Sequence, residues 1–314
     1  MNTYYLYQWE MTHEALIRFS NVYNSTIVIF GGEEWELGLH HDNITWKVFK
    51  KIAKQNKLVV IQGCYNTKLT KINTLYPLKT TVVYWPEFWA YRSRTVMKDY
   101  ICSHQDIKHL FLSLNNRPWK HRCQLIDLLA KHDMLNKGLW SFLKLPNPDA
   151  PETTYKFKYW KGVVTQIDNF NGYGNVISNG FSTSFVSLVA ESTTKSHFIT
   201  EKTWMCIYAE HPFLIIGPPH IHKFLKDTGI ELYDEIFDYS FDSIEDDMTR
   251  FENIVEQVNN LSTQNLEDLR NLLLPKLTRN RKKAFEISDR APPSIVMKYI
   301  KRNKSGFFKW IDWM

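Results

Sequence analysis

The sequence predicts an α/β fold built on parallel sheets, and three observations support this prediction. Six short apolar runs rich in β-branched residues recur along the chain, at residues 26–30, 57–61, 80–85, 109–114, 184–190 and 212–217. Helical patterns separate them, and strands that alternate with helices are typical of parallel sheets covered on both faces. The length of 314 residues suits one large α/β unit or two domains of ordinary size. Because the runs form two groups of three, we expect two Rossmann-like domains.

The division between the domains is expected near residue 100. Residues 87–107 show no strong strand pattern and are interpreted as the interdomain connection. This interpretation gives an N-terminal domain of residues 1–100, a second domain of residues 101–290 and a basic, aromatic segment of residues 291–314. In the second domain, a helix is expected after an N-cap at Ser243, and the next helix is expected to stop at Pro275.

The positive charge of the chain is concentrated at its C-terminal end. The net charge is +6, but residues 276–314 contain eleven Lys and Arg against three acidic residues, so the rest of the chain carries −2. With 44% hydrophobic and 23% charged residues, the composition is that of a globular protein rather than a disordered one. The basic, aromatic end is either a solvated terminal helix or a surface that contacts phosphates or an anionic membrane.

The sequence shows no targeting signal and no cysteine motif. Its first residues lack a basic stretch followed by an apolar one, and no segment approaches the roughly 20 apolar residues that span a bilayer. Cys64, Cys102, Cys123 and Cys206 are widely spaced, which disfavours a zinc site or a disulfide framework. We therefore expect a cytoplasmic protein with reduced thiols.

Two predicted strand-to-helix junctions are unusually polar and basic. In an open parallel sheet, ligands bind where strands end and helices begin, because helix N-termini present unpaired N–H groups. At the first junction a strand ends at Asn115, Asn116 and Arg117, and Pro118 suits the first position of a helix. Arg122 lies about one turn into that helix, so Arg117 and Arg122 are expected to flank the same ligand-binding opening at the end of the strand.

The second junction follows the fifth apolar run. Glu191 and Ser192 lie at the end of the predicted strand, and Thr200 is expected to cap a helix that begins with Glu201 and Lys202. A charge-assisted hydrogen bond contributes about 1.5–3 kcal/mol, against about 0.3–1 kcal/mol from the dipole of a helix N-terminus. Cations therefore decide the affinity of such a junction for a diphosphate. The alternative is that these charges are solvated or paired locally and only stabilise the helix start.

Several common functional motifs are missing. The sequence has no G-x-x-x-x-G-K-[ST] loop, no G-x-G-x-x-G after a strand and no G-x-S-x-G turn. It has no D-x-D motif, and acidic residues 245–247 fit the first turn of a helix without a metal. The histidine-containing residues 40–42 and 220–222 have no obvious complementary ligands, so we expect no metal site.

Residues 184–219, SFVSLVAESTTKSHFITEKTWMCIYAEHPFLIIGPP, resemble the donor-binding segment of the α-1,3-fucosyltransferase family, and the resemblance extends to about residue 242. In that family an apolar strand leads to an acid, a variable loop, a T-E-K helix start and an apolar strand that ends in Gly. Exostosin-like glycosyltransferases share this segment. Residues 109–140 are similar to the element of the same enzymes that carries a phosphate-binding arginine.

The resemblance implies a GT-B fold: two facing Rossmann-like domains, the nucleotide sugar held by the C-terminal one and the acceptor admitted by the N-terminal one. It implies no obligatory metal, and no cofactor apart from the nucleotide sugar as co-substrate. By position, Arg122 and Lys202 would bind the diphosphate, Glu201 would bind the ribose, and Glu191 would lie near the donor sugar or nucleoside. The remaining expected donor-site residues are Asn116, Arg117, Ser192 and Thr200.

The chain departs from the family pattern at Ser192 and at Thr203-Trp204, and the pattern does not fix the general base. Ser192 stands where Asn is common, and Thr203-Trp204 stands where an aliphatic residue is usual, so the donor sugar stays open. An inverting transfer needs a base. We expect Glu87, because WPEFW resembles the family's aromatic-flanked acidic turn, with Glu33 or Glu34 as alternatives. A retaining transfer would need no such base.

These features lead to one favoured function and two alternatives. The favoured function is the transfer of a sugar from a nucleotide donor to a saccharide hydroxyl, with inversion and without a metal. The first alternative keeps this reaction but makes the acceptor a modified base in DNA, as in phage DNA glycosyltransferases, because of the basic end and the 15% aromatic content. The second alternative is a non-catalytic nucleotide- or glycan-binding module.

Overall fold

The structure, a computed structural model, describes residues 3–7, 17–31, 44–62, 75–76, 79–85, 87–100, 106–115, 118–142, 155–162 and 180–290. The chain divides into two compact units, one formed by Met1–Trp89 with Ser288–Trp313 and the other by Ala90–Ile287. The division falls inside helix α4 (Phe88–Met97), whereas we expected it near residue 100. None of the described helices combines the length and apolar character needed to cross a bilayer.

The first unit contains a parallel sheet with the strand order β1-β2-β3-β4. Its strands are β1 (Thr3–Tyr7), β2 (Thr26–Gly31), β3 (Lys57–Gln62) and β4 (Thr80–Tyr84). Helix α2 (Ile44–Gln55) connects β2 to β3. Residues 27–29 and 58–60 are each at most 1% exposed. Since neighbouring residues of a strand point to opposite faces, such runs indicate that both faces of this sheet are covered.

The second unit contains a parallel sheet with the order β6-β5-β7-β8. Its strands are β5 (His109–Asn115), β6 (Gly138–Phe142), β7 (Ser184–Ala190) and β8 (Phe213–Ile216). Every residue of the central strand β7 and of the edge strand β8 is buried, so both faces of the sheet are covered at these strands. Gly138 pairs with Phe111, whose ring lies 2.3 Å from where a Cβ at position 138 would be, so glycine is required there.

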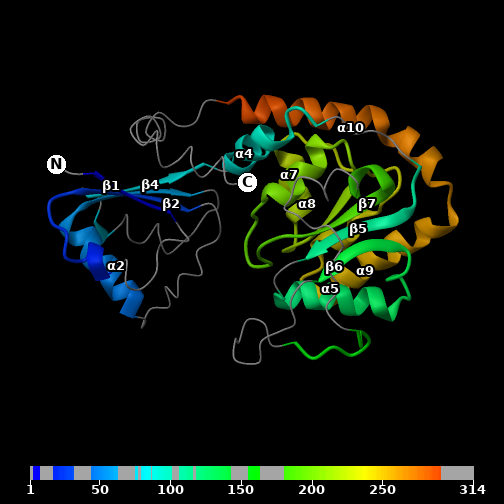
Figure 1. The fold of residues 1–314 in the computed structure, drawn as a ribbon, viewed down its shortest axis with the longest axis horizontal. Coiled ribbons are helices and arrows are strands. Elements are labelled where there is room, and N and C mark those ends of the chain that lie inside the picture. Colours follow the sequence, from blue (N-terminus) through cyan, green and yellow to red (C-terminus); the bar gives the residue numbers. More distant parts are fainter. Residues whose placement is uncertain are drawn as a thin grey trace. The chain divides into compact units, whose positions relative to one another are not determined.

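The strand order of this second sheet reverses between β5 and β7. Helix α5 (Lys120–Lys131) connects β5 to β6 on one side, whereas α7 (Glu201–Tyr208) connects β7 to β8 on the other. Crossovers between parallel strands are right-handed, so the two helices cover opposite faces of the sheet. Figure 1 shows α5 and α9 on one face and α7 and α8 on the other. The carboxyl ends of β5 and β7 therefore form a topological switch point, where open α/β sheets bind ligands.

The rest of the second unit is helical, and two expectations about it are corrected. Its elements are α8 (Ile221–Asp227), η3 (Tyr239–Ser243), α9 (Asp247–Asn260), η4 (Leu261–Thr263) and α10 (Leu266–Ser288). Asp246, not Ser243, caps α9, since its carboxylate accepts a hydrogen bond from the backbone N–H of Thr249 at 2.8 Å. Helix α10 continues through Pro275 instead of stopping there, because buried Leu273 and Leu277 anchor it on both sides of the exposed proline.

All six apolar runs form strands, within two residues of the expected ends, which confirms the prediction of an α/β protein with parallel sheets. Strands β1 and β6 were not predicted. Only two residues of β6, Ser141 and Phe142, are buried, and its sequence GLWSF contains no continuous β-branched run that would indicate a buried strand.

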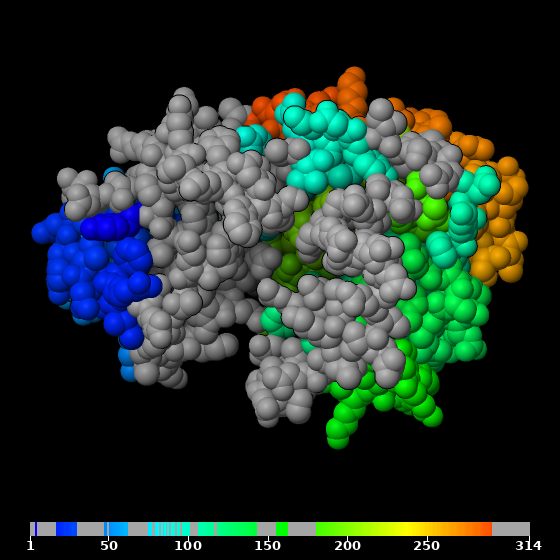
Figure 2. Space-filling model, viewed as in Figure 1, coloured from blue at the N-terminus to red at the C-terminus, as the bar shows by residue number. Residues whose placement is uncertain are grey.

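A buried carboxylate on α5 holds residues 155–162 of the second unit against that helix. Asp127 is 1% exposed, and its oxygens accept hydrogen bonds from the backbone N–H groups of Lys158, Tyr159 and Trp160 at 2.7–3.1 Å. The hydroxyl of Tyr155 donates a further bond at 3.1 Å. Figure 2 shows this bright green segment at the surface of the unit. It is thus a surface segment with a fixed conformation.

Candidate functional site

The candidate site lies at the switch point of the second sheet, where β5 ends at Asn115 and Glu191 follows β7. Asn115 is 2% exposed, and its amide nitrogen donates to the hydroxyl of Ser113 at 3.1 Å. The amide oxygen of Asn115 has no hydrogen-bond partner among the residues that the structure describes. A buried acceptor without a described partner marks the end of β5 as a candidate polar site.

Glu191 holds the first turn of α7. One of its carboxylate oxygens accepts hydrogen bonds from the backbone N–H of Thr200 at 3.0 Å and from the hydroxyl of Thr203 at 2.6 Å. The other oxygen accepts from the hydroxyl of Thr200 at 2.5 Å. Thr200 is also the N-cap of α7, because its hydroxyl oxygen accepts from the backbone N–H of Lys202. The predicted cap at Thr200 is confirmed.

The carboxylate of Glu191 is fully buried, with an exposed fraction of 0%. Burial raises the pKa of Glu191 above its ordinary value, although the charge of Lys202 and the hydrogen bonds from Thr200 and Thr203 oppose this. With three donors on two oxygens, the side chain is fully engaged by the protein itself. This environment favours a positioning role over the direct contact with a donor that the resemblance implied.

The first turn of α5 is tied to the same residue. The backbone carbonyl of Glu191 accepts a hydrogen bond from Nε2 of His121 at 2.7 Å and a longer one from Nη2 of Arg122 at 3.4 Å. Burial, and to a lesser extent the charge of Arg122, lowers the pKa of His121 to about 3. The imidazole is therefore neutral at physiological pH, and its single proton is on Nε2, because a carbonyl can only accept.

Lys202 provides a second cation at this site. Its Nζ lies 3.1 Å from the hydroxyl of Thr200 and 3.1 Å from a carboxylate oxygen of Glu201. The side chains of Lys202 and Glu201 are 24% and 21% exposed, so both reach solvent. The charge of Lys202 also lowers the pKa of His121, which indicates that the starts of α5 and α7 are electrostatically close.

This arrangement is suited to an anion. The guanidinium of Arg122 and the ammonium of Lys202 come from two helix N-termini, and both helices are joined through Glu191. The positive end of a helix dipole and charge-assisted donors act in the same direction on a phosphate. Glu201 and the amide oxygen of Asn115 add acceptors of the kind that bind hydroxyl or N–H groups.

The structure brings together Arg122, Glu191, Thr200, Glu201 and Lys202, as the two-junction prediction requires. Helix α5 begins at Lys120 rather than at Pro118, which places Arg122 in its first turn. Ser192 follows Glu191 and is half-buried.

The other predicted site residues are not tested by this geometry. Asn116, Arg117, Glu33 and Glu34 lie outside the described residues. Glu87 belongs to the first unit, where one of its carboxylate oxygens lies 3.7 Å from Nη1 of Arg290. Its role as a general base stays a prediction.

Sequence reasoning missed two residues of this site, His121 and Thr203. His121 directly precedes the predicted Arg122 in the first turn of α5, so the same strand-to-helix junction also indicated His121 as a site residue. Thr203 was noted only as a departure from the fucosyltransferase pattern. Its hydroxyl is in fact one of the three donors to Glu191, so this departure fits the buried acid.

Other reactive groups near the sheet have structural roles. Nε2 of His222 accepts the backbone N–H of Ile215 at 2.9 Å, and its Nδ1 donates to Asp242 at 2.9 Å, so both ring nitrogens are engaged. Burial raises the pKa of the Cys123 and Cys206 thiols to about 12. Neither thiol is therefore a nucleophile at neutral pH.

Comparison with known proteins gives similarity to solved structures alone, since no protein-family model and no curated protein sequence matches the chain. A DNA-modifying β-glucosyltransferase, crystallised with and without its substrate uridine diphosphoglucose, matches at 14% identity and a TM-score of 0.49. The match covers 88% of this chain and 75% of that chain. Two α1,3-fucosyltransferase structures, one with GDP, match at 12% and 11% identity with TM-scores of 0.37 and 0.35, covering 93% of each chain. At TM-scores below 0.5 this likeness assigns no activity.

Proposed function

We propose that this protein is a glycosyltransferase that moves a sugar from a nucleoside-diphosphate donor to a hydroxyl group of an acceptor, most simply a saccharide. One observation carries the proposal: Arg122 and Lys202, from two helix N-termini, flank the buried Glu191 at the switch point of a parallel sheet. A diphosphate is the ligand that matches two cations and two helix N-termini.

Each donor-site residue has a role in this proposal. Arg122 and Lys202 bind the diphosphate, and Glu201 accepts a hydrogen bond from a ribose hydroxyl. Ligand binding would redirect the Nζ of Lys202 from Glu201 towards phosphate, which frees the carboxylate of Glu201 for the ribose. Glu191 acts through Thr200 and Thr203, which it holds in place. Further donor contacts are proposed for residues at the same junctions, Asn116, Arg117 and Ser192.

The proposed reaction is an inverting displacement that needs no metal. A base removes the proton of the acceptor hydroxyl, whose oxygen forms a bond to the anomeric carbon as the bond to the diphosphate breaks. The electron pair leaves with the diphosphate, and Arg122 and Lys202 stabilise the charge that develops there. Glu87 is the proposed base, and Glu34 and Glu33 are the alternatives.

The first experiment is a thermal-shift panel of nucleoside diphosphates and their sugars without added metal. The wild type should show a selective rise in melting temperature with one nucleobase. Lys202→Ala and Arg122→Ala should lose this rise and the turnover of that donor, whereas Lys223→Ala should keep both. Lys223 is a matched control because it pairs with Asp227 on the exposed face of α8. If no nucleotide raises the wild-type melting temperature, or both site variants respond fully, the donor site is wrong.

A second candidate acceptor is a modified base in DNA. The observation that favours it is the basic charge of the chain beyond residue 276. Within residues 276–290, however, five of the six Lys and Arg side chains lie within 4.0 Å of a carboxylate. The charge left for a polyanion therefore lies chiefly in residues 291–314, which are outside the described part of the chain.

A cytoplasmic location belongs to the same proposal. It is supported by the free, buried thiols of Cys123 and Cys206 and by the wide spacing of all four cysteines in the sequence. Reduced cysteines are typical of a reducing compartment.

A further inference from the structure

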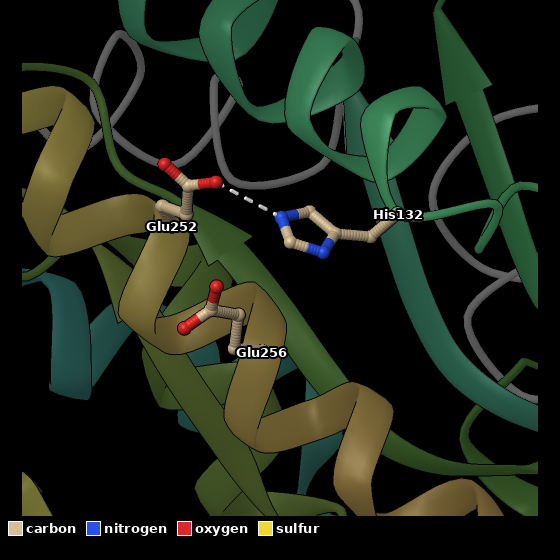
Figure 3. A group of neighbouring side chains, drawn as sticks. All are labelled: His132, Glu252 and Glu256. Atoms are coloured by element: carbon tan, nitrogen blue, oxygen red, sulfur yellow. Dashed lines mark hydrogen bonds and ion pairs between the residues drawn. The ribbon is translucent and has the colours of Figure 1, made fainter.

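A second group of ionisable side chains lies at the opposite end of α5 from Arg122. His132 is the C-cap of α5, and Glu252 and Glu256 are one turn apart on α9, which packs against α5. Figure 3 shows the imidazole and the two carboxylates turned towards one shared space between the helices. One potential ligand atom from each of the three lies within 4.8 Å of the others.

The spacing and the chemistry of this group resemble those of a metal site. In a tetrahedral zinc site with bonds of about 2.0–2.1 Å, neighbouring ligand atoms are about 3.3 Å apart. Nε2 of His132 and a carboxylate oxygen of Glu252 are already 3.1 Å apart. Glu256 is exposed, so its side chain can close the remaining distance by a change of rotamer. Imidazole nitrogen and carboxylate oxygen are both common zinc ligands.

The net charge of the side chains in this group also favours the binding of a cation. Lys131 forms an ion pair with Glu252, and this hydrogen bond is the largest cause of the lowered pKa of Glu252. Glu256 makes no ion pair with any residue that the structure describes, so the group keeps an uncompensated negative charge. The single charge of Lys131 therefore does not neutralise both carboxylates.

We propose that His132, Glu252 and Glu256 bind a divalent transition-metal ion of the Zn²⁺ type, with water completing the coordination, and that Lys131 competes with this ion for Glu252. On binding, the ring proton of His132 moves to Nδ1, so that Nε2 can donate its lone pair to the metal. Lys131 releases Glu252 when the ion binds; its Nζ also lies 5.8 Å from the centre of the Tyr159 ring.

The metal would link the C-terminal end of α5 to α9 and so stabilise the packing of these helices. Along α5 the site is about 15 Å from Arg122 by the rise of the helix, so the ion would not touch the proposed donor. Metal binding here is therefore independent of the proposed transferase reaction, which needs no metal. Binding to the folded state alone would raise the melting temperature.

The test is a calorimetric titration of the full-length, chelator-treated protein with Zn²⁺. The wild type should show one site per chain. His132→Ala and Glu256→Gln should each weaken that site by roughly tenfold or more, since each removes one of three protein ligands. Lys131→Met should strengthen it, because the competing cation is gone. A surface-charge effect alone predicts the same directions for Lys131 and Glu256, so the weaker binding of His132→Ala, which keeps every carboxylate, is the result that indicates coordination.

Two control variants separate this site from incidental binding. Glu235→Gln removes a carboxylate that also pairs with a lysine, Lys276, and should leave the affinity unchanged. A double replacement of His40 and His41 by Ala should also leave it unchanged. If the wild type shows no 1:1 binding, if Glu256→Gln binds like the wild type, or if Lys131→Met binds more weakly, the site is wrong. Glu256 is exposed, so its variant can overturn the proposal even if His132→Ala folds poorly.

Discussion

At the scale of the residue, Glu191 is the most informative side chain of the protein. It is buried at the end of β7, yet it is a carboxylic acid with three hydrogen-bond donors on its two oxygens. Its backbone carbonyl accepts from His121 and Arg122 on another helix. A single residue thus connects the starts of α5 and α7, and the positions of the two candidate phosphate-binding cations depend on it.

Replacing Glu191 by Ala should destabilise the protein. Each buried donor left without an acceptor costs about 1–3 kcal/mol, so we expect a loss of about 3 kcal/mol or more in the free energy of unfolding. Glu191→Gln keeps the shape and one acceptor and should cost less. Urea denaturation measures both. An alanine variant as stable as the wild type would show that the three hydrogen bonds contribute little.

The titration of Glu191 predicts a dependence of stability on pH. Because its pKa is raised in the folded state, the native protein holds a proton that the unfolded chain releases above its ordinary value of 4.5. The free energy of unfolding should therefore fall as the pH rises from 4.5 through the raised pKa. Glu191→Gln cannot titrate and should show a flatter profile over this window. Identical profiles for the two proteins would contradict the assignment.

At the scale of the element, α7 and α10 show how packing can agree with or override local sequence signals. Helix α7 begins where its hydroxyl cap predicts, and Trp204, Ile207 and Tyr208 are buried. Helix α10 runs through Pro275, although proline lacks the N–H that the helix needs. The burial of Leu273 and Leu277 outweighs that missing hydrogen bond.

Pro275→Ala should therefore stabilise α10. Proline is about 3 kcal/mol less favourable than alanine inside a helix, so the free energy of unfolding should rise by up to about 3 kcal/mol. Leu272→Ala is a matched control, because Leu272 is 56% exposed on the same helix and should change stability little. Thermal denaturation distinguishes the two. A destabilised Pro275→Ala would mean that neighbouring groups depend on the local geometry of the proline.

At the scale of the whole molecule, topology and charge distribution carry the functional argument. The reversal of strand order between β5 and β7 places two helix N-termini at one edge of the second sheet. The basic residues of α10 are largely paired with carboxylates such as Glu231 and Glu235. The balance between a saccharide and a DNA acceptor therefore depends on the five Lys and Arg residues of the segment 291–314.

Neutralising part of that segment tests the DNA alternative. A full-length variant with Lys298, Lys301, Arg302 and Lys304 replaced by Gln should bind duplex DNA more weakly if the segment binds phosphates. The slope of log affinity against log salt should become shallower by about 0.9 for each phosphate that the variant no longer neutralises. Nucleotide binding in the thermal-shift panel should not change. If the variant binds DNA as tightly as the wild type, or the wild type does not bind DNA, the DNA acceptor loses its support and the saccharide acceptor stays the proposal.

The six apolar strands, the α/β class, the Thr200 cap and the two basic junctions are readable in the sequence, because they depend on local periodicity and on residues close together in the chain. The passage of α10 through Pro275, the cap of α9 at Asp246 and the completion of the sheets by β1 and β6 depend on contacts between distant parts of the chain. The partners of Glu191 on α5 also depend on such contacts. His121 and Glu191 are 70 positions apart, and their hydrogen bond exists because parallel strands bring distant junctions to one edge of a sheet.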